Sequence, residues 1–167
     1  DILIENLKLE PDDKIADIGA GSGYFTFRMA KLVPQGEVYA VDISPQMLGI
    51  IKAKKGKLNA ENVTPVLGTT TALNLEDNSV DCVLMVDAYH EFSHPKEMGD
   101  AIYRALKPGG KLVLIEYRME DPLVPIKKLH KMSEKQSIRE ISATGLVWEE
   151  TLSVLPQQHF MVFNKPN

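Results

Sequence analysis

The sequence predicts an α/β protein built on a doubly wound, mostly parallel sheet with helices on both faces. Short apolar segments alternate with amphipathic segments five times between residues 14 and 117. Each crossover between parallel strands must place its helix on one face of the sheet, so this alternation is typical of a doubly wound fold. The chain has 167 residues, of which 44% are hydrophobic and 25% are charged. This length and composition fit one globular domain, which we expect to span residues 1–167.

The first part of the chain is expected to supply three strands, at residues 14–18, 37–42 and 63–68. The third of these contains Pro65, which cannot donate to a ladder, so this strand belongs at an edge of the sheet. A helix between the first two strands ends at Pro34. Its apolar face has helical spacing and consists of Phe25, Met29, Leu32 and Val33.

The helix after the second strand begins at Ser44-Pro45, where a residue type that caps helices precedes a proline at the first helical position. This helix should run to about Asn59. Its apolar face is expected to consist of Met47, Ile50, Ile51 and Leu58.

The alternation continues with a fourth strand at residues 80–87, which is apolar almost throughout. Such a run is expected of a parallel strand that helices cover on both faces. A helix follows at residues 95–106. The turn formed by residues 107–110 should then separate it from a fifth strand at residues 111–117.

The last part of the chain is predicted to be a helix and a hairpin, reached through an irregular connection. A capping box at Ser133 opens the helix, and Gly145 closes it. Two extended runs, at residues 146–155 and 158–164, then form an antiparallel hairpin. We expect Trp148 to belong to the core.

Bulk properties narrow the possible function classes. A net charge of −4 argues against a protein that clamps nucleic acid, because such binding uses many Lys and Arg contacts to phosphate. No apolar stretch approaches the roughly 18 residues that a membrane-spanning helix needs, so we expect no membrane partner. The single cysteine, Cys82, permits neither a disulfide within the chain nor a cysteine-based zinc cluster, and it favours a cytoplasmic location.

A glycine-rich loop and an acidic residue carry the strongest functional signal. Residues 17–23 lie between a predicted strand and a predicted helix, where glycines allow positive φ and a close approach of the backbone to a ligand. Asp42 ends the second strand, from which a carboxylate can accept hydrogen bonds from both ribose hydroxyls of an adenosine ligand. Together they indicate a nucleoside cofactor.

The spacing of the glycines bears on which cofactor binds. A dinucleotide fingerprint needs G-x-G-x-x-G, which seats a pyrophosphate on the N-terminus of a helix. Here the spacing is G-x-G-x-G, and Tyr24 stands where the third glycine would be. This spacing disfavours NAD.

The chain resembles the class I S-adenosylmethionine-dependent methyltransferases, whose first motif is an acidic residue, one spacer and G-x-G-x-G. Residues 17–23 match that motif fully, and residues 38–44, 80–84 and 106–112 match later segments in order. The resemblance implies a seven-stranded sheet of order 3-2-1-4-5-7-6 with strand 7 antiparallel. Relatives usually carry N-terminal helices that close over the cofactor. Because the first strand already begins at residue 14, we expect this cap to be lacking.

The resemblance also implies S-adenosylmethionine as cofactor, S-adenosylhomocysteine as product, and a role for each matching residue. Asp17 would buttress the loop, Asp42 would hold the ribose, and Thr69 stands where many relatives place an acid that meets the adenine amino group. The remaining implied cofactor contacts are Gly19, Ala20, Gly21, Ser22 and Gly23 for the methionine part, Ile43 and Met47 near the adenine, and Asp87 and Ala88 after the fourth strand.

Methyl transfer from a sulfonium is an in-line displacement, so its main requirement is to hold the acceptor atom close to the methyl group. The segment after the fourth strand projects beside the sulfonium and contains Tyr89 and His90. His90 is our candidate general base, because an ordinary imidazole titrates near ~6.5. A helix-capping or packing role for both residues stays open. For a further set we favour a structural role: Glu116, Tyr117, Arg118, Lys127 and His130.

Residues 90–94 also match H-E-x-x-H, the zinc-protease signature, which needs both histidines on one helical face. Pro95 biases His94 away from helical φ and ψ, so we interpret the pentapeptide as the connection between a strand and a helix. We therefore expect no metal site there.

Two further alternatives stay open from the sequence, namely an NAD-dependent oxidoreductase and a module that binds the cofactor without turnover. The methyl acceptor cannot be read from the residues. We expect a small molecule rather than a nucleic acid, because the chain is acidic.

Overall fold

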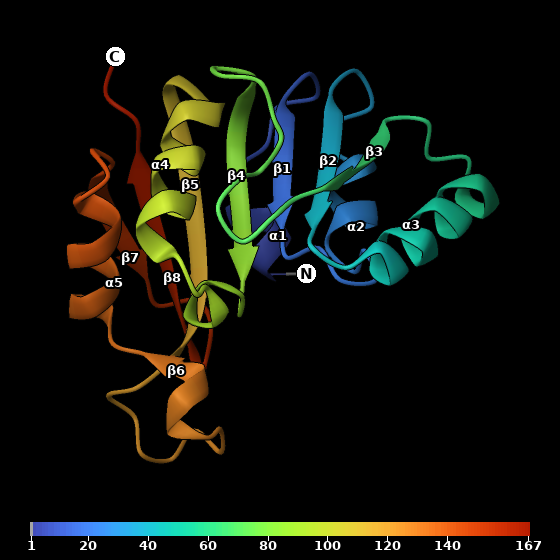
Figure 1. Cartoon of the computed structure of the whole chain (residues 1–167). Coiled ribbons are helices and arrows are strands. Elements are labelled where there is room, and N and C mark those ends of the chain that lie inside the picture. Colours follow the sequence, from blue (N-terminus) through green and yellow to red (C-terminus); the bar gives the residue numbers. More distant parts are fainter. Residues whose placement is uncertain (1) are drawn as a thin grey trace.

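The computed structural model describes residues 2–167 and confirms the doubly wound α/β fold (Figure 1). The strands are β1 (Lys14–Ile18), β2 (Glu37–Asp42), β3 (Val63–Leu67), β4 (Val80–Val86), β5 (Leu106–Arg118), β6 (Lys131–Met132), β7 (Val147–Leu152) and β8 (Gln158–Asn164). Seven of them form the order β3-β2-β1-β4-β5-β8-β7, and the two-residue β6 pairs with the end of β5. Neighbours run parallel except for β8, which is antiparallel to β5 and to β7. The expected order is therefore confirmed, with β6 as an addition.

Helices cover both faces of this sheet. They are α1 (Ile2–Asn6), α2 (Thr26–Ala30), α3 (Pro45–Leu58), α4 (Pro95–Ala105) and α5 (Glu134–Ser142). Side chains alternate along each strand, so Ile15 of β1 belongs to the apolar cluster that includes residues of α1, α2 and α3, whereas Ala16 belongs to the cluster that includes residues of α4 and α5. The two resulting apolar clusters form the core, one on each side of the sheet. No helix within residues 2–167 is long and apolar enough to cross a membrane.

The edge position predicted for the proline-containing strand is confirmed. β3 lies at one end of the strand order and pairs with β2, with Pro65 opposite Ala40. Proline removes a donor from a ladder, and an edge strand tolerates that loss because one of its sides has no neighbour.

The apolar face predicted for α3 was right for Ile51 and wrong for its other three residues. Leu48 and Ile51 are the buried residues of this helix, whereas the predicted Met47, Ile50 and Leu58 are 39%, 42% and 56% exposed. α3 packs near the edge of the sheet, against β2 and β3, and only a narrow stripe of its surface meets them. Helical spacing alone cannot say how wide the buried stripe is.

Two further expectations differ from the structure. Trp148 is 41% exposed, because it lies on the outer strand β7 beside a register shift, and its indole N–H donates to Thr151 Oγ1 at 3.2 Å. β5 begins at Leu106 instead of residue 111. Leu106 pairs with Val80, and the ladder then shifts register, so the Pro-Gly-Gly segment lies inside the strand as an irregularity.

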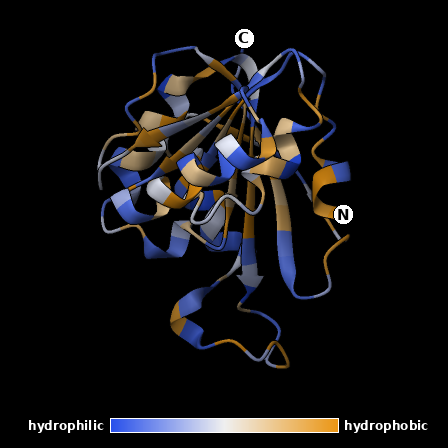
Figure 2. Cartoon of the chain, turned by 90° about the vertical axis from the view of Figure 1, so that its right-hand side faces the viewer, coloured by the Kyte–Doolittle hydropathy of each residue, from blue (hydrophilic) through white to orange (hydrophobic). Residues whose placement is uncertain are grey.

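A long excursion leaves the sheet between β5 and α5, over residues 119–132. It contains the short helix η2 (Lys128–His130) and β6, which returns beside the end of β5. Figures 1 and 2 show it projecting beyond one end of the sheet, where β4 and β5 also end. The excursion therefore stands beside the edge where ligands bind in folds of this kind.

Candidate functional site

The glycine loop follows β1 directly and turns tightly across the carboxyl ends of the strands. Gly19, Gly21 and Gly23 all have positive φ, at 73°, 53° and 81°. The loop is tied down because Gly19 and Ala20 both donate their N–H groups to the carbonyl of Val41, at 2.9 and 3.1 Å. A Cβ on Gly19 would lie 2.8 Å from the Cβ of Ala88. Only glycine combines this conformation with this contact.

Asp42 closes the loop from the neighbouring strand. Its Oδ2 accepts the N–H of Gly21 and its Oδ1 accepts the N–H of Ser44, each at 2.8 Å. A carboxylate has about four lone-pair sites, so these two contacts leave acceptor capacity on both oxygens. Asp42 is therefore held in a fixed orientation and can still accept hydrogen bonds from a ligand.

Asp17 lies beneath the loop and does not reach the cleft. It is 3% exposed, and the Thr26 hydroxyl donates to its Oδ2 at 2.5 Å. Burial raises the pKa of the Asp17 carboxyl to about 6, although the hydrogen bonds from Thr26 act in the opposite direction. Asp17 thus links β1 to the start of α2.

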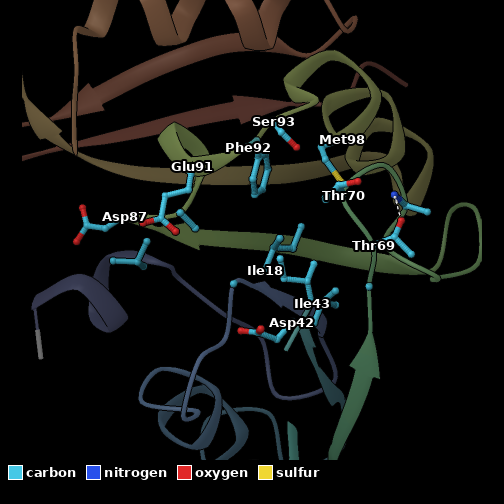
Figure 3. A pocket seen from close by; sticks show the side chains of 16 residues that line it. Ile18, Asp42, Ile43, Thr69, Thr70, Asp87, Glu91, Phe92, Ser93 and Met98 are labelled. Atoms are coloured by element: carbon cyan, nitrogen blue, oxygen red, sulfur yellow. Dashed lines mark hydrogen bonds between the residues drawn. The ribbon is translucent and has the colours of Figure 1, made fainter. Parts of the chain in front are cut away.

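A cleft of about 260 Å³ opens beside the loop, at the ends of β1, β2 and β4 (Figure 3). Several of the predicted cofactor contacts line it, namely Gly19, Asp42, Ile43, Thr69, Asp87 and Ala88. Others lie in the loop or on α3 and not on the lining: Ala20, Gly21, Ser22, Gly23 and Met47. The wall facing the loop consists of residues that the sequence did not single out for this role, namely Glu91, Phe92, Ser93 and Met98.

Asp87 is the most unusual residue of the cleft. It has a positive φ of 51°, and its Oδ2 accepts a hydrogen bond from Gln158 Nε2 at 2.7 Å. Its Oδ1 is buried and has no hydrogen-bond partner among residues 2–167. Burial raises the pKa of Asp87, and the contact with Gln158 opposes that change. A buried oxygen without a partner is costly, so this atom fits a site for a cationic or N–H donor group of a ligand.

Thr69 lines the cleft with a hydroxyl that is already used as an acceptor. Its Oγ1 accepts the N–H groups of Thr71 and Ala72, at 3.2 and 3.0 Å. A hydroxyl oxygen has two acceptor lone pairs and one hydrogen to donate. Thr69 can therefore donate to a ligand but cannot readily accept from one.

A second cavity of about 340 Å³ adjoins the cleft, on the side of the excursion. Tyr89 and His90 line it from η1 (Tyr89–Glu91), and Phe92 lines both spaces. The Tyr89 hydroxyl donates to Glu140 Oε2 at 3.2 Å. Burial, followed by the nearby Glu140, raises the pKa of Tyr89 far above its ordinary value, so this hydroxyl stays neutral.

His90 is held by a buried carboxylate. Its Nδ1 lies 2.7 Å from Glu116 Oε2, and the side chain of Glu116 is 0% exposed. Glu116 Oε1 accepts the N–H groups of Tyr89 and His90, at 2.9 and 3.3 Å. Burial raises the pKa of Glu116, and the His90 ring acts in the opposite direction. Because a carboxylate only accepts, His90 donates from Nδ1 and keeps a lone pair on Nε2.

The reading of the H-E-x-x-H pentapeptide as a connection is confirmed. His90 and Glu91 lie in η1, whereas His94 is the residue before α4, with φ of −131° and a contact to Ser93 Oγ at 2.9 Å. The second histidine beside His90 is instead His130 of the excursion, whose Nδ1 lies 3.1 Å from His90 Nε2. Glu116 and His130, for which the sequence favoured structural roles, thus lie in contact with His90, the candidate base. Nothing in their spacing along the chain signals this, since each lies at least 26 residues from His90.

Comparison with known proteins finds similarity to methyltransferases. The family described as "Methyltransferase domain" matches residues 16–114. An uncharacterized methyltransferase-like protein of Schizosaccharomyces pombe is 36% identical over 150 residues, which cover 90% of this chain and 56% of that protein. The ubiquinone/menaquinone biosynthesis C-methyltransferase UbiE of Pasteurella multocida is 32% identical over 132 residues, covering 77% of this chain and 49% of that protein. The chain thus spans about half the length of these curated relatives.

Solved structures show the same fold. A SAM-dependent methyltransferase from Aquifex aeolicus superposes with a TM-score of 0.90 at 23% identity, covering 97% of this chain and 87% of that one. A putative methyltransferase solved in complex with the Haloferax volcanii Trm112 methyltransferase activator has a TM-score of 0.82 at 19% identity, with 99% of this chain and 88% of that one covered.

Proposed function

The chain belongs to the methyltransferase-domain family and has the class I S-adenosylmethionine-dependent fold, and on this premise we propose that it transfers a methyl group from S-adenosylmethionine to an acceptor. The observation that carries the proposal is the cleft at the ends of β1, β2 and β4, which is lined by both Asp42 and Asp87, the second of which has a buried Oδ1 without a partner among residues 2–167. When bound, the cofactor supplies a methyl group on a sulfonium, and S-adenosylhomocysteine remains after transfer.

The residues of the cleft fit the parts of this cofactor. Asp42 would accept both ribose hydroxyls, and Asp87 Oδ1 would accept the methionine ammonium, which supplies the donor that this oxygen lacks. Thr69 would donate to a ring nitrogen of the adenine instead of accepting from its amino group, because its lone pairs are taken. Ile43 and Met47, 62% and 39% exposed, are apolar surfaces that the adenine would cover.

The glycine loop, residues 19–23, would pass along the methionine part of the cofactor, with Ala88 facing it from the end of β4. Ala20, Ser22 and the glycines at 21 and 23 do not line the cleft, so we assign them to the shape of the loop and not to side-chain contacts. Asp17 supports the loop from below.

We assign the adjoining cavity to the methyl acceptor. Its volume of about 340 Å³ fits a small molecule, and the acidic chain offers little attraction to nucleic acid. His90 lines this cavity, backed by Glu116, and would remove a proton from an acceptor that reaches its Nε2 in place of His130. Tyr89 would position the acceptor or its own helix, since its raised pKa excludes it as a base. A cytoplasmic location is in keeping with the single cysteine, which is buried.

Calorimetric titration tests the cofactor assignment. We expect S-adenosylhomocysteine to bind with one-to-one stoichiometry and NAD not to bind. NAD binding without S-adenosylhomocysteine binding would reject the proposal in favour of an oxidoreductase. A screen of acceptor pools for release of S-adenosylhomocysteine from S-adenosylmethionine then separates an enzyme from a binding module.

A further inference from the structure

Three side chains that can bind a metal ion converge beside the acceptor cavity. They are His90 and Glu91 of η1 and His130 of the excursion, and one ligand atom from each lies within 4.8 Å of the others. His90 Nε2 is 3.1 Å from His130 Nδ1 and 3.9 Å from Glu91 Oε1. The methyl transfer proposed above uses only His90, so the convergence of all three side chains needs a separate explanation.

The His90 ring is oriented as a metal ligand would be. A histidine that binds a metal usually donates its other ring N–H to a carboxylate, which fixes the tautomer and the direction of the lone pair. Glu116 supplies this carboxylate from the end of β5, with a side chain that is 0% exposed. Two backbone N–H groups hold Glu116 in turn. The lone pair of His90 Nε2 is therefore aimed at His130 before any ion binds.

The distances are close to those of a formed site. Two nitrogens bound to one tetrahedral zinc ion at about 2.0–2.1 Å lie roughly 3.3 Å apart. The two histidine nitrogens already stand 3.1 Å apart. The Glu91 side chain is 68% exposed and so has room to close the remaining gap.

The charges around the cluster favour a dication. Glu91, Glu116 and Asp87 are acidic groups near the His90 ring. Two lysines near His130 also line the adjoining cavity: Lys131 donates its Nζ to the carbonyl of Asp121 at 3.1 Å, and Lys128 is exposed to solvent. The acidic groups in contact with the His90 ring would therefore be the main charges that favour an ion between the histidines.

We propose that His90, Glu91 and His130 bind a divalent transition-metal ion of the zinc class, with Glu116 fixing the His90 ring. Three protein ligands leave a fourth position, which an oxygen of water or of the acceptor would fill. In the metal-bound protein Nε2 of His90 is a ligand, so His90 can act as a base only in the metal-free protein. The sequence expectation of no metal concerned the H-E-x-x-H pentapeptide, in which His94 would be the second histidine, and in the proposed set His130 takes the place of His94.

Cobalt(II) binding tests the site without cofactor or turnover. The full chain, stripped with a chelator, is titrated with Co²⁺ and its visible absorption followed, and Zn²⁺ is then added in competition. We expect one Co²⁺ per chain, displaced by Zn²⁺. Cys82 is the single cysteine and is buried, so cobalt bands would report on nitrogen and oxygen ligands.

Three variants assign the ligands. His130→Ala should weaken Co²⁺ binding more than about 100-fold and the exposed Glu91→Gln about 10-fold or more, because the loss of a group that only orients a metal ligand already costs about 10- to 100-fold. His94→Ala is the matched control, because it removes the other histidine of the pentapeptide, and it should leave binding unchanged. If His130→Ala does not fold, the affinity of Glu91→Gln for Co²⁺ still tests whether this cluster binds the metal.

Equal affinity in all variants, absence of cobalt bands, or loss of binding with His94→Ala alone would each overturn the proposal. Binding of S-adenosylhomocysteine is measured separately on the same protein. If the protein binds Co²⁺ but not S-adenosylhomocysteine, the proposed methyl transfer is rejected and the proposed metal site is retained.

Discussion

At the scale of single residues, Asp42 is the side chain whose role is most directly testable. Asp42→Asn keeps the size of the side chain but removes the charge and one acceptor oxygen. Hydrogen bonds to a charged group contribute roughly 1.5–3 kcal/mol, so we expect the affinity for S-adenosylhomocysteine to fall about 10- to 100-fold, measured by calorimetry. Glu37→Gln, at the other end of the same strand, is the control and should bind S-adenosylhomocysteine with unchanged affinity.

The raised pKa of Asp17 predicts that the stability of the protein depends on pH. Burial raises the pKa of the Asp17 carboxyl to about 6 from its ordinary value of 3.8, so the folded protein holds this proton more tightly than the unfolded chain does. The resulting stabilisation is fully present below about pH 4 and is lost as the pH rises through about 6. Two pKa units correspond to about 3 kcal/mol.

Asp17→Asn cannot titrate and still accepts from the Thr26 hydroxyl. Relative to the unmodified protein, this variant should therefore gain stability between pH 4 and pH 7, as measured by urea unfolding at several pH values. A difference in unfolding free energy that stays constant with pH would contradict the assignment.

His90 should affect turnover more than binding. We expect His90→Ala to lower kcat about 10²- to 10⁴-fold, the range of general acid–base catalysis, with the dissociation constant of S-adenosylhomocysteine almost unchanged. An unchanged rate with a competent acceptor would assign His90 to structure. A loss of cofactor binding would instead show that the segment after β4 shapes the cleft.

Sequence reasoning located some of these residues and missed others for a physical reason. The glycine loop and Asp42 are predictable because local constraints define them, namely positive φ in a tight turn and the end of a strand. The unpartnered oxygen of Asp87 and the pairing of His90 with Glu116 and His130 depend on contacts between distant segments. Such contacts leave no periodic pattern in the chain.

At the scale of elements, the turn from β1 to α2 allows a paired test. Gly19 and Gly21 both have positive φ, and an alanine at either position should cost about 1–2 kcal/mol in unfolding free energy. A Cβ on Gly21 meets nothing within 4 Å, whereas one on Gly19 would press on Ala88 in the cleft. We expect Gly19→Ala, which adds this clash, to lower the melting temperature more than Gly21→Ala does and to weaken cofactor binding more. Equal binding by both would contradict a role for this contact.

Elements with strong local signals were predicted well, and elements defined by their neighbours were not. Ser44 before proline and Ser133 before its helix both cap as expected, each accepting an N–H three residues later. The buried stripe of α3, the exposure of Trp148 and the strand β6 were missed. In each of these cases the partner strand, and not the segment itself, decides the outcome.

At the scale of the whole molecule, cofactor binding should stabilise the fold. At 100 times the dissociation constant, a ligand that binds only the folded state adds about 2.7 kcal/mol. For a chain of this size that corresponds to a rise in Tm of roughly 5–10 °C, which a thermal scan with S-adenosylhomocysteine measures. NAD at the same concentration is the control and should produce no rise.

The two outer strands of the sheet have a consequence for how the protein meets other copies of itself. An exposed strand edge is a template on which another chain can add a strand, and such addition leads to aggregation. Pro65 leaves β3 without one donor, and β7 carries Glu149 and Glu150 beside a register shift. Both edges are therefore poor templates. We therefore expect a stable assembly of this chain to be built through its helices or the rim of its cleft, and not by extending the sheet.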